Sequence, residues 1–290
     1  MDLHLSGKTA LVTGANRGTG QVIAQTLISE GVRVALHSND ADAFGSQTVG
    51  SPTVDSQAIT SRKMNSQEVE RQLVDSQVND KTVYVCGDIR TDLGAAQVIE
   101  QTLASVGVPD ILVNNYGTGT RGRWGDVGEE DFLAMYQTNV LSATRMVQGF
   151  IEGMKAKHWG RIIQLGTIGS HQPNSIMPHY YASKGALATL MVGLANELAN
   201  TGITVNTVSP GLIKTDEVEA GYRAMAKRKG WGDDWDTIAR QVASSEYPNP
   251  CGRIATREEV ADLVTFIASP RADFINGENI RIDGGAVRYV

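Results

Sequence analysis

Short apolar segments alternate with longer segments of helical spacing along most of the chain. The short segments are rich in β-branched residues and span residues 9–12, 32–36, 82–86, 111–113, 161–165, 204–208 and 279–282. Apolar side chains at helical spacing occupy the stretches 22–27, 131–153 and 182–200 between them. Strands that alternate with helices predict right-handed crossovers. We therefore expect an α/β fold, a doubly wound and mostly parallel sheet of the Rossmann type with helices on both faces.

One connection is longer than a single helix needs, namely the 43 residues from 39 to 81. Apolar residues recur every five positions in residues 44–78, beginning with Phe44, Val49 and Val54. Because five residues turn a helix by about 500°, successive members point about 140° apart and no apolar face results. The pattern predicts a polar surface insertion at about 40–65, with a helix resuming near 66–78. A lid or partner site is the alternative interpretation.

Length and composition indicate one globular domain over residues 1–290. Of the 290 residues, 41% are hydrophobic and 20% are charged, which excludes a wholly disordered chain. The net charge is −6 and no basic stripe is evident, so a nucleic-acid partner is not expected. No apolar run approaches the roughly 18 residues that cross a bilayer, so no membrane partner is expected either.

The N-terminus and the cysteines favour a cytoplasmic protein. Residues 1–4 include no basic segment followed by a long apolar stretch, so no secretory signal is expected. Cys86 and Cys251 are too few for a disulfide framework, which favours a reducing compartment. Neither His171 nor His179 has a metal-ligand pattern around it, so we assign no metal.

A glycine-rich turn joins the first expected strand to the first expected helix. It reads Thr13-Gly14-Ala15-Asn16-Arg17-Gly18-Thr19-Gly20. Glycines at 14, 18 and 20 let the backbone turn tightly and approach a pyrophosphate, while the helix N-terminus supplies N–H donors and a positive dipole. At a strand–helix junction this motif predicts a dinucleotide site.

The spacing of these glycines resembles the classical short-chain dehydrogenase/reductase family. Further motifs agree with the resemblance: Asn114-Asn115-Tyr116-Gly117, where the family has Ala for Tyr116; Asn139 in the next long helix; Tyr180-x-x-x-Lys184; and Pro210-Gly211-x-x-x-Thr215. The resemblance covers essentially the whole chain apart from the 40–65 insertion. It implies an oxidoreductase that moves a hydride between a nicotinamide cofactor and a carbonyl or alcohol. It also implies a homotetramer or homodimer.

Charge near the adenosine ribose indicates NADP(H) rather than NAD(H). An acid at the end of the second strand would accept the ribose 2′-hydroxyl and repel a 2′-phosphate. That end reads His37-Ser38-Asn39, with Ser38 at the position of the acid. Arg17 matches the basic residue of NADP-dependent family members, and a guanidinium binds a phosphate bidentately. Asp40 is the competing residue, since a shifted register would bring it to the ribose.

The other cofactor contacts follow from the resemblance alone. Asp88 and Ile89 would border the adenine, and Asn115 the adjacent ribose. Ile213 and Thr215 would contact the nicotinamide carboxamide. The remaining expected contacts are loop residues and turn residues of the motifs quoted above: Asn16, Thr19, Gly117, Pro210 and Gly211.

Tyr180 and Lys184 are the expected catalytic pair. They are four residues apart, so on a helix they share one face. A free tyrosine has a pKa near 10, and a neighbouring ammonium lowers it by favouring the phenolate. Lys184 would therefore tune Tyr180, and by resemblance would also hold the nicotinamide ribose. By resemblance Asn139 would support a water relay to Lys184, whereas Tyr181 is out of pattern.

Thr167 stands where the family has its substrate-orienting serine, thirteen residues before the tyrosine. Threonine supplies the same hydroxyl and adds a methyl group that restricts its rotamer. We interpret Thr167 as a working replacement. Ser170 is the alternative donor, and loss of activity is the third interpretation.

Residues 212–250 correspond to the variable substrate loop of the family. The segment is long and contains four aromatic residues: Tyr222, Trp231, Trp235 and Tyr247. They belong either to a helix pair packed on the core or to a closing lid. Tyr116, Trp124 and His179 are further candidates for substrate contact.

These features together predict an NADPH-dependent reductase that converts a ketone to a secondary alcohol, reversibly, with Tyr180 as general acid and base. An NAD-dependent dehydrogenase of a sugar, cyclic or steroid-like alcohol is the alternative enzyme. A dinucleotide-sensing regulatory protein without turnover is the alternative from a different class, and it rests on the substitution at Thr167.

Overall fold

The computed structural model describes residues 1–40 and 81–288. The predicted insertion, its five-residue period and the helix expected near 66–78 fall on 41–80, outside the described residues. Among the described residues, no helix is both long enough and apolar enough to cross a membrane.

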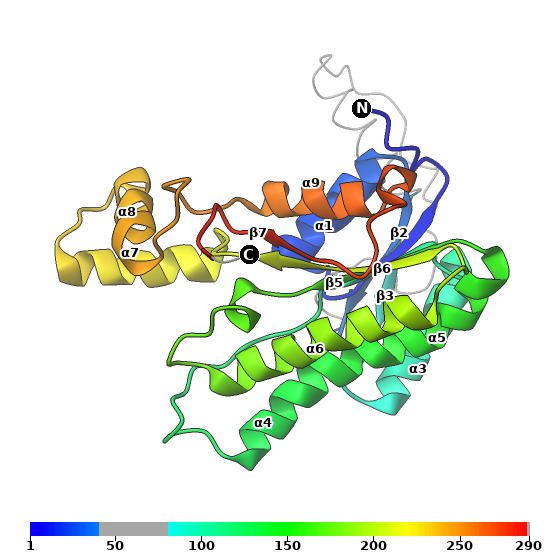
Figure 1. Ribbon diagram of the computed structural model, residues 1–290, viewed down its shortest axis with the longest axis horizontal. Helices are drawn as coiled ribbons and strands as arrows, with labels where there is room; N and C mark the ends of the chain where they lie inside the picture. Colours follow the sequence, from blue (N-terminus) through cyan, green and yellow to red (C-terminus); the bar gives the residue numbers. More distant parts are fainter. Residues whose placement is uncertain (41–80, 289–290) are drawn as a thin grey trace, which may run out of the picture.

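In the described part of the chain, seven parallel strands form a single sheet, as predicted (Figure 1). Their bounds are β1 Thr9–Val12, β2 Arg33–Ser38, β3 Thr82–Cys86, β4 Ile111–Asn114, β5 Gly160–Leu165, β6 Ile203–Pro210 and β7 Asn279–Ile282. The strand order is β3-β2-β1-β4-β5-β6-β7, with Leu11 aligned to Ala35 on one side and to Leu112 on the other. The order reverses direction between β1 and β4, and such a switch point leaves a crevice at the carboxyl ends of the strands.

Helices cover both faces of the sheet. Their bounds are α1 Gly18–Ser29, α3 Asp92–Val106, α4 Glu129–Tyr136, α5 Ser142–Lys157, α6 Pro178–Glu197, α7 Asp216–Lys229, α8 Trp235–Gln241 and α9 Arg257–Ile267. Helices α1 and α9 pack on one face, and α3, α5 and α6 pack on the other (Figure 1).

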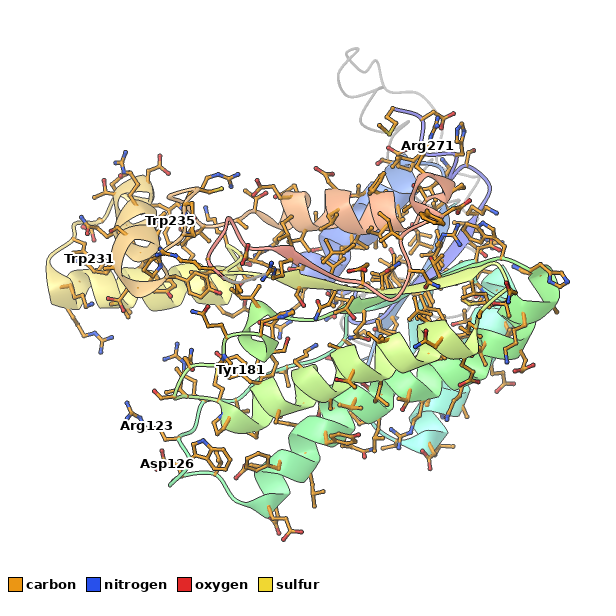
Figure 2. All side chains as sticks on the ribbon, viewed as in Figure 1. Arg123, Asp126, Tyr181, Trp231, Trp235 and Arg271 are labelled. Atoms are coloured by element: carbon orange, nitrogen blue, oxygen red, sulfur yellow. The ribbon has the colours of Figure 1, made fainter. Side chains whose placement is uncertain are left out.

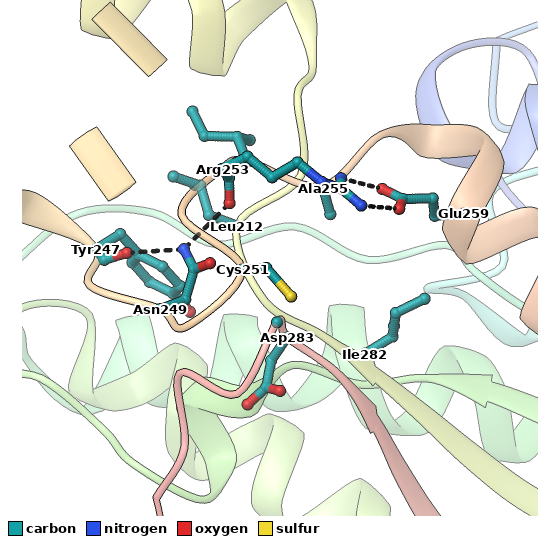
Figure 3. A pocket seen from close by; sticks show the side chains of 11 residues that line it. Leu212, Tyr247, Asn249, Cys251, Arg253, Ala255, Glu259, Ile282 and Asp283 are labelled. Carbon is teal, nitrogen blue, oxygen red and sulfur yellow. Dashed lines mark hydrogen bonds and ion pairs between the residues drawn. The ribbon is translucent and has the colours of Figure 1, made fainter. Parts of the chain in front are cut away.

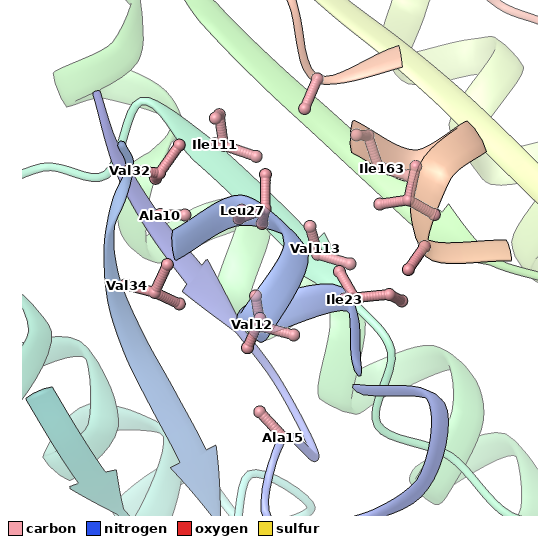
Figure 4. Packing of buried hydrophobic residues seen from close by; sticks show 14 of the residues in the cluster. Ala10, Val12, Ala15, Ile23, Leu27, Val32, Val34, Ile111, Val113 and Ile163 are labelled. Atoms are coloured by element: carbon pink, nitrogen blue, oxygen red, sulfur yellow. The ribbon is translucent and has the colours of Figure 1, made fainter. Parts of the chain in front are cut away.

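Alternation along each strand divides the core between the two faces. Ala10 and Val12 of β1 pack with Ile23 and Leu27 of α1, whereas Leu11 between them packs on the opposite face (Figure 4). Because successive side chains of a strand point to opposite faces, a strand covered on both sides must be apolar throughout. This explains why the short strands are continuous apolar runs in the sequence.

The helix expected at residues 131–153 is interrupted in the structure. Helix α4 ends at Tyr136, a π-helical turn covers Gln137–Leu141, and α5 begins at Ser142. The turn contains Asn139, which is fully buried. A π turn inserts a residue into the helical repeat and is frequent at functional sites. Hydrophobic spacing alone does not reveal it, because the segments on either side keep their helical period.

Helices α7 and α8 form a unit that extends beyond the sheet (Figures 1 and 2). Their aromatic residues surround a small apolar cluster of their own rather than the main core. This cluster comprises the buried residues Ala226, Ile238, Val242 and Ile254, against which Leu212, Tyr222, Trp231, Trp235 and Tyr247 are packed. The aromatic residues of this segment therefore hold α7 and α8 together around a small core of their own.

Arg161 of β5 is the largest fully buried side chain among the described residues. Its guanidinium donates to the Gly160 carbonyl at 2.8 Å, pairs with Asp273 and stacks on the Trp159 ring at 4.3 Å. Burial lowers the pKa of Arg161, and the Asp273 carboxylate opposes that shift. The carboxylate therefore compensates a buried charge at the base of the sheet.

Replacing Asp273 with Ala leaves Arg161 buried without its counter-ion. We expect Asp273→Ala to lower the free energy of unfolding by roughly 1–3 kcal/mol, since an uncompensated buried charge is costly. Denaturant unfolding measures the change, with Asp262→Ala as the control because Asp262 is an exposed carboxylate of the nearby α9. Equal stability of the two variants would contradict the assigned role of Asp273.

Candidate active site

A cavity of about 670 Å³ opens at the carboxyl edge of β1, β2 and β4. The glycine-rich loop, Asn39 and Asp40 after β2, the 115–118 segment after β4, and the start of α7 line it. Its volume falls within the range of small-molecule and cofactor sites, about 300–1,000 Å³. It also lies at the switch point of the sheet, where open α/β folds bind their ligands.

The loop fits a pyrophosphate. Gly14 and Gly18 have φ of +64° and +62°, a conformation that other residues rarely adopt. At Gly20 a Cβ atom would lie 2.3 Å from the Gly14 carbonyl oxygen, so only glycine fits there. No side chain caps the N-terminus of α1 and no acid occupies its first turn. The N–H groups of this described helix are therefore open to an anion in the cavity.

His37 supports this loop from behind rather than lining the cavity. Its side chain is fully buried, its Nδ1 accepts from the Gly14 N–H at 3.1 Å, and its Nε2 donates to the Gly87 carbonyl at 2.9 Å. Burial lowers the pKa of His37 to about 4, so the ring is neutral at pH 7. Ser38 is buried too, and from this strand end only Asn39 and Asp40 line the cavity among the described residues.

Asn115 and Tyr116 also meet the loop. Asn115 Nδ2 donates to the carbonyls of Thr13 and Gly14, both at 3.0 Å, so its amide positions the loop. Tyr116, expected at the substrate, lines the dinucleotide cavity, with its ring centroid 6.0 Å from that of His37. These contacts connect the ends of β1, β2 and β4.

The expected adenine residues differ in exposure. Ile89 is buried in the core. The Asp88 carboxylate accepts from Arg90 at 2.8 Å, and this bond holds the pKa of Asp88 below its usual range. The motifs did not predict this contact between Arg90 and Asp88, because it depends on the local turn and not on a spacing between motifs.

Thr167 and Tyr180 lie in hydrogen-bonding contact. Burial raises the pKa of Tyr180 to about 12, although the bond from Thr167 opposes that shift. The Thr167 hydroxyl also accepts from the Gly169 N–H at 3.2 Å. The Ser170 hydroxyl instead donates to the Thr167 carbonyl at 2.7 Å. The structure therefore places Thr167, and not Ser170, beside the tyrosine.

Lys184 is buried on the same helix, where its Nζ donates to the Leu165 carbonyl at 2.8 Å. Burial lowers the pKa of Lys184 to about 8. The expected lowering of the Tyr180 pKa by Lys184 is not seen: burial of the phenol raises this pKa, and the opposing contribution comes from Thr167. The tyrosine is consequently a protonated phenol at neutral pH.

Two glycines connect this pair to the dinucleotide cavity. Gly117 lines the cavity, and a Cβ atom there would lie 3.2 Å from Lys184 Nζ and 2.6 Å from Asn139 Oδ1. A Cβ atom at Gly119 would lie 2.9 Å from the Tyr180 ring. Tyr180 and Lys184 therefore lie directly behind the 117–119 backbone, at one end of the cavity.

Asn139 holds that backbone in place. Its Oδ1 accepts from the Thr118 N–H at 3.0 Å, and its Nδ2 donates to the Thr118 carbonyl at 3.0 Å. Nδ2 also donates to the Ser183 hydroxyl at 3.1 Å. The buried π turn thus brings one amide to both the cavity wall and the helix of the catalytic pair.

Trp124 lies in the loop before α4, and His179 lies at the start of α6, where it contacts that loop. His179 is buried, with Nε2 2.8 Å from the Thr120 hydroxyl and its ring 5.9 Å from that of Phe132. Trp124 is 74% exposed and packs on the other side of Phe132, at 5.7 Å. Trp124 is thus open to solvent, whereas His179 positions the loop. Figure 2 shows this loop, with Arg123 and Asp126, next to Tyr181.

The segment after β6 leads into α7. Gly211 donates to the Ile282 carbonyl at 2.9 Å, and a Cβ atom there would lie 3.0 Å from the Asp283 Cα atom. Ile213 bridges to Ala255, and the Thr215 hydroxyl caps α7 by accepting from the Val218 N–H at 3.2 Å. Pro210 ends β6. These contacts fix the backbone from which α7 starts.

A second cavity, of about 170 Å³, lies under the segment that returns from α8 (Figure 3). Asn249 Nδ2 donates to the carbonyls of Tyr247 and Arg253, and Arg253 pairs with Glu259 of α9. This cavity is too small for a dinucleotide. Its bonds attach the base of the α7–α8 unit to the core.

A glycine loop suited to an anion lies at the switch point of a parallel sheet, and a Tyr–Lys pair lies at the end of the same cavity. Together these features define a dinucleotide-dependent oxidoreductase. The chain belongs to the short-chain dehydrogenase/reductase family: the family model described as enoyl-(acyl carrier protein) reductase matches residues 56–287. This confirms the family resemblance of the motifs and the Rossmann-type fold.

Known relatives span the whole chain. The 3-oxoacyl-(acyl-carrier-protein) reductase of Escherichia coli is 30% identical over 286 residues, which are 98% of each chain. The crystal structure of L-sorbose reductase from Gluconobacter frateurii, complexed with NADPH and L-sorbose, has a TM-score of 0.84 at 30% identity, with full coverage of both chains. A 3-oxoacyl (acyl-carrier-protein) reductase from Agrobacterium tumefaciens with NADP bound has a TM-score of 0.77 at 27% identity, covering 98% of this chain and 96% of that one.

The burial of His37 predicts how the free energy of unfolding changes at acid pH. The unfolded chain binds a proton at this ring near pH 6.5 and the folded chain only near pH 4, so folding stability falls as pH drops through this window. The loss amounts to roughly 3 kcal/mol. We expect His37→Gln, which retains a donor and an acceptor, to lose less stability over the same window in denaturant unfolding. His4→Gln, at an exposed histidine, is the control and should behave as wild type; identical pH profiles for all three proteins would refute the assignment.

Proposed function

We propose that this protein is an NADPH-dependent carbonyl reductase that converts a ketone to a secondary alcohol, reversibly. The observation that carries the proposal is the Thr167–Tyr180 contact at the end of a dinucleotide cavity. A ketone there would meet two hydroxyl groups on its oxygen. When bound, the nicotinamide supplies the hydride.

Tyr180 acts as the general acid in this proposal. Its pKa of about 12 keeps the phenol protonated at neutral pH, so it can donate its proton to the carbonyl oxygen. Thr167 hydrogen-bonds the same oxygen and orients it. Lys184, with a pKa of about 8, is mostly an ammonium at pH 7 and would bind the nicotinamide ribose hydroxyls. Asn139 holds the Thr118 backbone and would support a water relay to Lys184.

Charge in the cavity supports NADP(H) over NAD(H). The Arg17 side chain lines the cavity and is 79% exposed, so its guanidinium can reach a 2′-phosphate bound there. L-sorbose reductase, 30% identical over the whole chain, is complexed with NADPH. Asp40 also lines the cavity, which favours NAD(H) as the second candidate cofactor.

The substrate we propose is a small polar ketone. The Tyr181 hydroxyl, next to Tyr180, hydrogen-bonds Asn174. Burial raises the pKa of both Tyr181 and Tyr222, and the Arg121 guanidinium lies close enough to oppose that shift. Phenol, amide and guanidinium groups suit a hydroxylated ketone better than a long alkyl chain. The sugar substrate of L-sorbose reductase agrees with this choice. A homotetramer or homodimer remains a prediction from the family resemblance, and a cytoplasmic location remains a prediction from the cysteine usage.

A panel of ketones with NADPH tests the function. We expect wild-type protein to oxidise NADPH with ketoses and to form the corresponding alcohols. Tyr180→Phe should lower kcat by about 10²–10⁴-fold, because the proton donor is lost, while NADPH binding stays nearly unchanged. Tyr136→Phe, at an exposed phenol of α4, is the control. Turnover of Tyr180→Phe close to wild type would mean that another group donates the proton.

Thr167 permits a sharper test, because both its hydroxyl and its methyl can be removed separately. Thr167→Ser should retain substantial activity, whereas Thr167→Val keeps the shape and should lose about 10²–10³-fold in kcat with saturating NADPH. Ser170→Ala should remain active, because Ser170 bonds the backbone. An active Val variant together with an inactive Ser170→Ala would transfer the role to Ser170.

A further inference from the structure

Two neighbouring helices each place an arginine at the dinucleotide cavity. Helices α1 and α9 share one apolar cluster, in which Ile23 and Leu27 pack with Val260 and Val264 (Figure 1). Arg17 is the N-cap of α1, and Arg257 is the first residue of α9. Both line the cavity. Arg257 belongs to none of the motifs that identify the cofactor site.

Each arginine is paired with a carboxylate at the start of α7. Arg17 lies 3.3 Å from Glu217, and Arg257 lies 2.7 Å from Asp216. The two carboxylates are adjacent in sequence, are 68% and 94% exposed, and line the same cavity. Helix α7 therefore begins with two negative charges held against two cations that line the cavity.

The two arginines differ in how firmly they are held. The Arg257 side chain is only 21% exposed, and its Nε donates to the Lys214 carbonyl at 3.2 Å. That bond fixes the guanidinium while its other nitrogens face Asp216 and the cavity. Arg17 is 79% exposed and has no such backbone bond among the described contacts. Arg257 is thus a preorganised cation and Arg17 an adjustable one.

Exposed ion pairs of this kind are weak and exchange readily for a better anion. A phosphate offers more charge and several acceptor oxygens, and a guanidinium binds it bidentately. The pyrophosphate is common to both nicotinamide cofactors, while the 2′-phosphate occurs only in NADP(H). The uncapped α1 N-terminus, next to both arginines, marks where the pyrophosphate belongs.

We propose that Arg257 is a second cationic contact for the cofactor pyrophosphate, and that Asp216 and Glu217 occupy Arg257 and Arg17 until the cofactor phosphates displace them. Glu217 then competes only with the 2′-phosphate at Arg17. Asp216 competes with the pyrophosphate at Arg257, and so affects both cofactors. Displacement frees the start of α7 from these arginines. The proposal rests on the proposed dinucleotide-dependent function.

Equilibrium binding of NADPH and NADH, followed by cofactor and tryptophan fluorescence without substrate, tests the exchange. Glu217→Gln should tighten NADPH binding about two- to fivefold and leave NADH unchanged. Asp216→Asn should tighten both by a similar factor. Arg257→Gln should weaken both by at least roughly tenfold, while Arg257→Lys restores part of the loss. Arg17→Ala should weaken NADPH much more than NADH.

Two matched controls separate this exchange from a general charge effect. Glu219 lies in the same first turn of α7 but pairs with Arg223 and Lys214 outside the cavity, so Glu219→Gln should change neither affinity. Arg253 pairs with Glu259 away from the cavity, and Arg253→Gln should likewise have no effect. Thermal unfolding of each variant without cofactor verifies that it is folded.

The outcomes distinguish this inference from the function on which it rests. Wild-type affinities for both cofactors in folded Arg257→Gln would overturn the role of Arg257. Equal effects of Glu217→Gln and Glu219→Gln would overturn the competition. If the wild-type protein bound neither NADPH nor NADH, the proposed function itself would fail.

Discussion

The parallel direction of all seven described strands is the constraint from which the site follows. Because every strand runs the same way, all carboxyl ends and the loops that leave them lie at one edge of the sheet. The reversal of strand order between β1 and β4 opens a crevice at that edge. The glycine loop, the 115–118 segment and the start of α7 follow three different strands, yet they line one cavity.

Buried polar side chains hold these loops in register. His37 and Asn115 bond the backbone of the glycine loop, and Asn139 bonds both backbone groups of Thr118. In a low-dielectric interior such bonds are strong, and an unsatisfied partner is costly. Each loop therefore has one well-defined conformation, although the loops themselves carry little apolar surface. The proton and hydride transfer of the proposed reaction would thus take place between loops whose backbones are held in fixed positions.

Much of the architecture was predictable, because a strand buried on both faces must be apolar and a helix covering it must be amphipathic. Residues 9–12, 82–86 and 279–282 were predicted with the observed bounds. The π turn around Asn139, the supporting role of His37 and the contacts of Arg257 were not predicted. These depend on bonds between residues distant in sequence, which neither periodicity nor motif spacing encodes. The Thr167–Tyr180 contact was predictable only in part. The motif spacing suggested Thr167, but only the structure shows that the Ser170 hydroxyl bonds the Thr167 carbonyl instead of Tyr180.

Lys184 has a consequence for the evolution of this chain. An ammonium buried against a single carbonyl, with a pKa lowered to about 8, is an unfavourable element of the folded state. A methionine of similar shape in its place would remove the buried charge and raise the free energy of unfolding, at the expense of the cofactor contact proposed for Lys184. If the protein requires that contact, this helix stays below its attainable stability, and the well-packed sheet offsets the difference.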